Sequence, residues 1–164
     1  KSDQRRERRE MRTTITAAMV LAVLALAAPL TAGTPRAAQH VRIEASGPNS
    51  ETFVLTPMTS GRIRADTGVV TFCCWSMTHV VRAGETLDVN DPHLTFKGTH
   101  GTLRFRNRVE FVDLPDGWSV FTGTWKAVGG TGAYGSAAGS GRVVGISNAS
   151  GFTRVQLFGS LTSK

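Results

Sequence analysis

The chain has 164 residues, enough for one domain, and its 19 Lys and Arg against 12 Asp and Glu give a formal net charge of +7. Residues 1–12 hold six of the basic and three of the acidic residues, so the rest of the chain carries only +4. A surplus of this size is not the basic footprint of a nucleic-acid-binding protein, and nucleic acid is therefore not an expected partner.

The first 38 residues are expected to lie outside the folded domain. Residues 1–10 contain no apolar side chain, which predicts a disordered charged leader. Residues 11–38 have the pattern of a secretory signal peptide, because Met11 and Arg12 precede an apolar run at 17–30 and small residues follow it. The run is shorter than the roughly 20 apolar residues that span a bilayer, which favours a cleaved signal over an uncleaved anchor helix. We therefore expect a secreted protein with no membrane partner after cleavage.

The pattern from residue 39 to residue 164 predicts a single all-β domain. Short alternating runs are broken by Gly, Pro, Asn and Asp about every ten residues, which is typical of an antiparallel barrel or sandwich. Turn residues are expected at both ends of 82–92 and through the glycine-rich stretch 129–141. Hairpin turns are expected at 99–101, around His100-Gly101, at Pro115-Asp116-Gly117 and at 148–151. The strands are expected at 41–44, 52–56, 61–66, 69–81, 94–98, 102–112, 118–128, 142–146 and 152–161.

The only two cysteines, Cys73 and Cys74, are adjacent in the chain. A disulfide between neighbouring residues closes a strained ring, and on a regular strand the two side chains would point to opposite faces. We therefore expect free thiols and a domain that folds without long-range disulfides. Their role is left open by the sequence.

The run 102–112 predicts which face of the sheet looks inward. Its apolar side chains alternate with Arg104, Arg106, Arg108 and Glu110, so the apolar row is expected inside and the charged row outside. Asn107 is the one polar residue in the inward row. Because a buried amide needs partners, Asn107 is either a structural amide bonded to backbone or a polar contact that points into a barrel cavity. The inward row consists of Leu103, Phe105, Asn107, Val109 and Phe111.

The run 118–128 carries Phe121 and Trp125 on one face, together with Gly123 and Ala127. An alternation of large and small side chains suits the interior of a small barrel, where not every position has room for a ring. This face is therefore expected to look into the barrel.

No motif in the chain predicts a cofactor or a metal. Residues 130–135 match G-x-G-x-x-G, but the residues after them are too rich in glycine to open the helix that a dinucleotide site needs. The four histidines have no metal-ligand spacing, so neither a metal site nor a cofactor is expected. No set of catalytic residues can be named from the sequence.

Residues 125–139 (WKAVGGTGAYGSAAG) resemble the V-G-G-T-G-x-[FY]-x-x-A-x-G signature of the allene oxide cyclase and dirigent superfamily, and similar segments occur in secreted actinobacterial proteins of unknown function. The resemblance implies a barrel of about eight antiparallel strands with a hydrophobic lumen, and a β-sandwich is the alternative. It also implies that Tyr134 plugs or borders the barrel. The family includes cyclases of reactive intermediates and proteins that steer radical coupling. Their catalytic residues cannot be matched to positions in this chain.

Two functions follow as alternatives. In the first, the barrel binds an apolar small molecule in its lumen, as a binder or as a cyclase-like, isomerase-like or dirigent-like protein. The candidate lumen residues are Phe105, Asn107, Phe121, Trp125 and Tyr134. In the second, the domain is a non-catalytic extracellular interaction or structural module, whose outward arginine row meets an anionic cell-wall polymer. The sequence does not decide between an enzyme and a binding protein, and it does not predict the oligomeric state.

Overall fold

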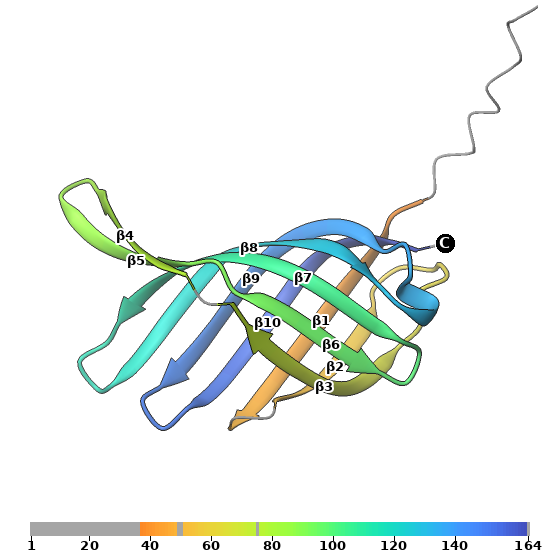
Figure 1. The fold of residues 1–164 in the computed structure, drawn as a ribbon, viewed down its shortest axis with the longest axis horizontal. Helices are drawn as coiled ribbons and strands as arrows, with labels where there is room; N and C mark the ends of the chain where they lie inside the picture. Colours follow the sequence, from red (N-terminus) through yellow and green to blue (C-terminus); the bar gives the residue numbers. More distant parts are fainter. Residues whose placement is uncertain (1–36, 49–50, 75, 164) are drawn as a thin grey trace, which may run out of the picture. The chain divides into compact units, whose positions relative to one another are not determined.

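The computed structural model describes residues 37–48, 51–74 and 76–163, so the expected leader and almost all of the expected signal peptide lie outside the described residues. No helix within these ranges has both the length and the apolar character that crossing a membrane requires. The described chain forms ten strands and one short 3-10 helix (Figure 1). In chain order these are β1 (Gln39–Pro48), β2 (Glu51–Pro57), β3 (Asp66–Cys73), β4 (Met77–Arg82), β5 (Glu85–Asn90), β6 (His93–Gly98), β7 (Thr102–Asp113), β8 (Trp118–Gly130), η1 (Gly132–Tyr134), β9 (Ala138–Asn148) and β10 (Phe152–Thr162).

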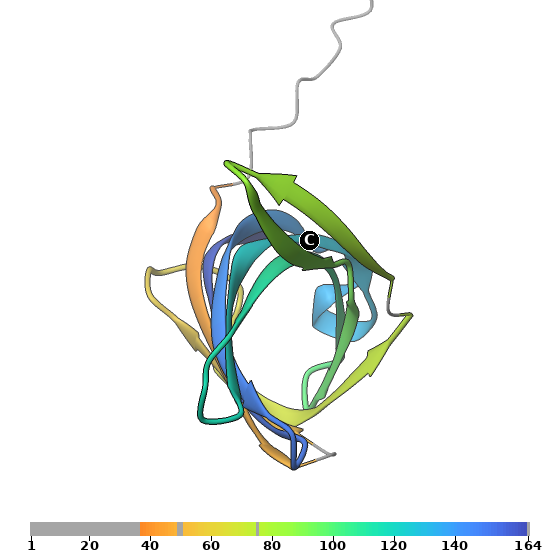
Figure 2. The ribbon, with the colours of Figure 1, turned by 90° about the vertical axis from the view of Figure 1, so that its left-hand side faces the viewer.

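Eight of the described strands close into an antiparallel barrel. They follow the order β7-β6-β3-β2-β1-β10-β9-β8, and β8 pairs back onto β7 to complete the ring that Figure 2 shows end-on. The predicted all-β barrel is confirmed, and the alternative of a β-sandwich is wrong. The hairpin turns expected at residues 99–101, 115–117 and 148–151 lie between the strands that they were expected to join.

The observed strands differ from the predicted ones before β3 and after β8. The strand expected at 61–66 is wrong for residues 61–65, which form a loop before β3 begins at Asp66. This loop needs no partner strand, because the buried side-chain amide of Gln39 donates to the carbonyls of Thr59 and Ile63 and accepts from the Ile63 N–H. The glycine-rich stretch is a shorter turn than expected, since β8 runs on to Gly130 and β9 starts at Ala138.

Strands β3 to β6 form one long hairpin. Its base, β3 and β6, belongs to the barrel wall, and its tip, β4 and β5, projects from it. Residues 85–90, for which only flanking turns were predicted, form β5, and β5 and β6 keep a single register against β7 through Pro92. The opposite strand has one extra residue between Cys73 and Met77, so the run expected from 69 to 81 is interrupted by a β-bulge. Cys74 takes a left-handed backbone conformation there, with φ of 64°. Because a bulge bends and twists its strand, β4 and β5 project beyond the ring (Figure 1).

Aromatic side chains fill the middle of the barrel. Ring centroids are 5.2 Å apart for Phe53 and Phe96, 5.2 Å for Phe96 and Phe105, and 4.7 Å for Phe105 and Trp125, whose rings stack. The indole N–H of Trp125 donates to the carbonyl of Phe158 at 3.1 Å, so its one polar atom is satisfied. The inward rows predicted for β7 and β8 are confirmed, because their side chains are buried or half-buried while the three arginines of β7 are exposed.

One end of the barrel is closed by η1 and by the loop before β3. The buried ring of Tyr134 extends the core at this end, and its hydroxyl donates to Oδ2 of Asp66 at 2.9 Å. The N–H of Ala133 donates to the carbonyl of His100 and so fastens η1 to the turn between β6 and β7. The opposite end carries the bulge and the turn between β9 and β10, and it is hollow.

Candidate functional site

A cavity of about 360 Å³ lies at the hollow end of the barrel. Its volume falls within the range of small-molecule sites, which is roughly 300–1,000 Å³. Its walls come from β3, β6, β7, β8 and β10, from the end of β9 and from the turn that follows it. Seven of the twelve described lining residues have apolar side chains, namely Phe72, Pro92, Leu94, Val109, Phe111, Phe121 and Val155.

Two phenylalanines form an aromatic wall of this cavity. Phe111 on β7 and Phe121 on β8 are direct cross-strand partners, with ring centroids 5.1 Å apart and planes inclined by 39°. Phe121 also pairs with Gly145 on β9, and a Cβ at Gly145 would collide with the Phe121 ring. The ring of Phe121 therefore occupies the space that a side chain at Gly145 would fill.

Asn107 contributes the one amide on β7 that faces the cavity. Only 5% of the residue is exposed, and its side-chain oxygen has no hydrogen-bond partner among the residues that the structure describes. Its backbone N–H is engaged, because it donates to the carbonyl of Pro92 at 2.9 Å. An unsatisfied buried polar atom costs about 1–3 kcal/mol, so its presence calls for an explanation. Of the two roles predicted for Asn107, the geometry favours a polar contact for a molecule in the cavity.

A second buried amide, Asn90, was missed by the sequence analysis. Asn90 is fully buried, and within the described part of the chain neither its side-chain oxygen nor its side-chain nitrogen has a hydrogen-bond partner. It pairs with the inward-facing Val109 on β7, and directly paired residues of antiparallel strands share a face. The inner wall near the cavity thus holds two amides with unused hydrogen-bonding capacity. The sequence did not reveal this residue, because Asn90-Asp91-Pro92 has the composition of a turn, whereas β5 and β6 keep one register against β7 across it.

The five candidate lumen residues do not form one site. Asn107 and Phe121 line the cavity. Phe105 and Trp125 lie in the packed aromatic stack, with 1% and 2% exposed, and they do not border the cavity. Tyr134 closes the other end of the barrel. The expected continuous lumen is therefore divided by the aromatic stack.

The closed end holds a buried carboxylate whose hydrogen bonds are fully used. Asp66 accepts from the Tyr134 hydroxyl, from the hydroxyl and N–H of Thr99, and from the N–H groups of Thr67 and His100. Burial alone would raise the pKa of Asp66, but the bonds from Thr99, Tyr134 and His100 outweigh it and lower the pKa to about 2. Burial and the bond to Asp66 raise the pKa of Tyr134. A carboxylate held as an anion by five donors serves to fasten this end.

No family model, curated protein or solved structure matches this chain. The resemblance of residues 125–139 to the allene oxide cyclase and dirigent signature therefore stays a prediction.

Proposed function

We propose that this protein is a secreted barrel that binds a neutral, mainly apolar small molecule carrying a hydroxyl group in the cavity at its hollow end. The observation that carries the proposal is the side-chain oxygen of Asn107, which has no partner among the described residues and lies in the wall of a mainly apolar cavity. A hydroxyl can donate to an amide oxygen and accept from an amide N–H, so it satisfies the Asn107 amide at whichever edge it meets. Export of the chain rests on the signal pattern of residues 11–38.

The lining favours a neutral ligand. None of the described residues that border the cavity is charged, and an unpaired charge in such a site would be strongly disfavoured. The polar side chains Ser147, Asn148 and Thr153 lie at the turn between β9 and β10 or close to it. We infer that the apolar body of the ligand lies against Phe111 and Phe121, with its hydroxyl directed to Asn107.

Cyclase-like or dirigent-like action, which the resemblance implies, is compatible with this lining. Such proteins can act by holding a reactive chain in one conformation, and this requires shape more than charged groups. No described residue that lines the cavity is titratable, so acid–base chemistry is not part of the proposal. The proposed function is therefore ligand binding. If the ligand is reactive, the barrel would act on it by holding it in one conformation.

The test is titration with matched pairs of ligands that differ only by a hydroxyl. Linear, monocyclic and bicyclic alcohols, with 1-naphthol and naphthalene as one pair, would be titrated calorimetrically against the wild type and Asn107→Leu. We expect the alcohol of at least one pair to bind the wild type about 5-fold more tightly than its hydrocarbon, as one hydrogen bond of about 1 kcal/mol implies, and Asn107→Leu to abolish the difference. Arg104→Gln, which alters the outer surface, should bind like the wild type. No binding across the series, or an unchanged preference in Asn107→Leu, would contradict the proposal.

A second candidate function rests on the outer face of β7. Arg104 and Arg106 are exposed, and Arg106 pairs across the sheet with Lys126. Among the described residues, neither arginine has an ion-pair partner, whereas Arg108 binds Asp91 at 3.1 Å. This cationic strip fits an anionic polymer of the cell wall. Retention on cell-wall fractions that salt elutes, and that is lost when all three arginines are changed to Ala, would support it. Retention of the triple variant on the cell-wall fractions would show that these arginines do not bind the polymer.

A further inference from the structure

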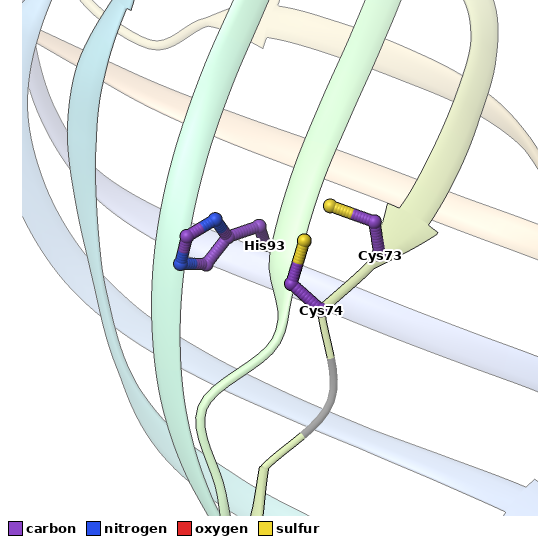
Figure 3. Close-up of side chains that lie close together, drawn as sticks. All are labelled: Cys73, Cys74 and His93. Carbon is purple, nitrogen blue, oxygen red and sulfur yellow. The ribbon is translucent and has the colours of Figure 1, made fainter.

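Three side chains that ligate metals meet on the outer wall of the barrel, at the bulge (Figure 3). They are Cys73 at the end of β3, Cys74 in the bulge and His93 at the start of β6. One ligand atom from each, two sulfurs and one imidazole nitrogen, lies within 4.8 Å of the others. Both cysteines are exposed free thiols and His93 is half-buried, so the cluster is open to an ion from solvent.

The local fold explains why both thiols reach the same place. Cys73 and His93 are direct cross-strand partners, so their side chains share the outer face of the sheet. On a regular strand Cys74 would point to the opposite face, and this was the expectation from the sequence. The left-handed conformation of Cys74, with φ of 64°, breaks the alternation and places its sulfur beside that of Cys73. The bulge therefore converts two neighbouring residues into a pair of ligands.

We propose that Cys73, Cys74 and His93 bind a thiophilic metal ion, Zn²⁺ or Cu⁺. Two thiolates and an imidazole are the ligand types that these ions prefer. In a tetrahedral zinc site, metal–ligand distances of about 2.0–2.3 Å place ligand atoms roughly 3.5–3.8 Å apart. The ligand atoms, which lie up to 4.8 Å apart, thus need to approach one another by roughly 1.3 Å at most, through side-chain rotation. Three protein ligands leave a fourth position for water on Zn²⁺, whereas they can complete a trigonal Cu⁺ site.

The charges around the cluster favour thiolate ligands. Arg106 on β7 is the cross-strand partner of His93, on the side of β6 opposite to β3. Its side chain therefore adds a positive charge to the outer face that carries the cluster. A cysteine binds a metal ion as its thiolate, so metal binding must displace the thiol protons. Affinity should consequently rise with pH, as for other thiolate sites. This site lies on the outer wall and is independent of the ligand proposed for the cavity.

The proposal is tested by titrating the reduced full-length protein anaerobically with two probes. Co²⁺ replaces Zn²⁺ and reports thiolate ligation through sulfur-to-cobalt charge-transfer bands, and Cu⁺ is titrated in competition with a chromogenic chelator. We expect one ion per chain with at least one probe. Cys73→Ser, Cys74→Ser and His93→Gln should each weaken binding by at least about 10-fold, since even loss of an outer-shell partner costs 10–100-fold. His79→Gln is the matched control, because His79 is an exposed histidine of β4 that bonds Asp88 outside the cluster.

The two probes distinguish a zinc site from a copper site. Binding of Co²⁺ that Zn²⁺ displaces assigns zinc, and binding of Cu⁺ alone assigns copper. Absence of stoichiometric binding by both probes, full affinity in His93→Gln, or an equal loss in His79→Gln would overturn the proposal. The far-ultraviolet circular dichroism of each variant must match that of the wild type, so that weakened binding is read as loss of a ligand and not as loss of the fold.

Discussion

The hydroxyl of Tyr134 and Oδ2 of Asp66, 68 residues apart in the chain, are joined by a buried hydrogen bond of 2.9 Å. This bond connects η1 to the first residue of β3 and fastens the closed end of the barrel. The hollow end, by contrast, has buried amides with unused capacity at Asn90 and Asn107. The polar groups of the closed end are therefore hydrogen-bonded, whereas the hollow end keeps amides with unused hydrogen-bonding capacity.

Removal of the Tyr134 hydroxyl should weaken the fold without changing the cavity. Tyr134→Phe keeps the ring and leaves Asp66 with one donor fewer, and hydrogen bonds to charged groups contribute about 1.5–3 kcal/mol. We expect the free energy of unfolding in urea to fall by about 2 kcal/mol, while affinity for the cavity ligand is unchanged. Thr162→Val is the control, because it removes an exposed hydroxyl that bonds the carbonyl of Ala138. Equal stability of Tyr134→Phe and the wild type would contradict the role given to this bond.

The lowered pKa of Asp66 predicts a loss of stability in acid. The pKa is about 2 in the folded protein against a usual value of 3.8, so the folded state favours the anion. Its contribution, about 2 kcal/mol, is present above pH about 4 and is lost as the pH falls towards about 2. Urea unfolding from pH 5 to pH 2 should show this slope, and Asp66→Asn should remove it. A slope that survives in Asp66→Asn, or that disappears in the exposed-site control Asp116→Asn, would contradict the prediction.

The unsatisfied amide of Asn107 predicts that this residue lowers the stability of the fold while it serves ligand binding. Asn107→Leu removes a buried polar group with an unpartnered oxygen and keeps a similar volume, so we expect unfolding to cost about 1 kcal/mol more than in the wild type. Gln39→Leu is the matched comparison, since the Gln39 amide bonds Thr59 and Ile63, and it should lose stability. Thermal and urea unfolding of both variants would decide. A marked loss of stability in Asn107→Leu would mean that this amide is structural.

The space left by Gly145 predicts an effect on Phe121. A methyl group at position 145 would overlap the Phe121 ring and would also crowd the carbonyl of Arg154. We expect Gly145→Ala to lower stability by about 1–3 kcal/mol, as overpacking does, and to weaken ligand binding by displacing the ring. Gly135→Ala should be close to neutral in both measurements, because a Cβ there meets only the carbonyl of Gly132, at 3.4 Å. Wild-type stability in Gly145→Ala would contradict the prediction, because it would show that the Phe121 ring can move without cost.

The parts of the fold that the sequence predicts are those set by local pattern. The alternation along 102–112 was enough to assign the inner and outer faces of β7, and Pro115-Asp116-Gly117 was enough to place a hairpin turn. The barrel itself followed from the spacing of short strands and from the resemblance of residues 125–139, and no helix was expected in the domain.

The rest depends on register between distant strands, which a sequence pattern does not contain. The side-chain amide of Gln39 replaces a strand partner for residues 61–65, and only the folded chain brings it to Ile63. His93 meets Cys73 because of the pairing of β3 with β6, so the spacing of histidines gave no sign of a metal site. The division of the lumen likewise arises from the stacking of Phe105 on Trp125, two residues that sequence reasoning placed beside a ligand.

The projecting hairpin of β4 and β5 gives the molecule two levels of local stability. Within the described chain, every strand of the ring is paired on both sides, whereas β4 hydrogen-bonds to β5 alone and so has a free edge. Its outer residues Met77 and Val81 are exposed, so little apolar burial opposes its detachment. Amide protons of β4 should therefore exchange with solvent through local opening, with free energies well below those of β1 or β10. Hydrogen–deuterium exchange would resolve the two levels, and uniform protection of β4 and the ring would show instead that the hairpin opens only with the whole barrel.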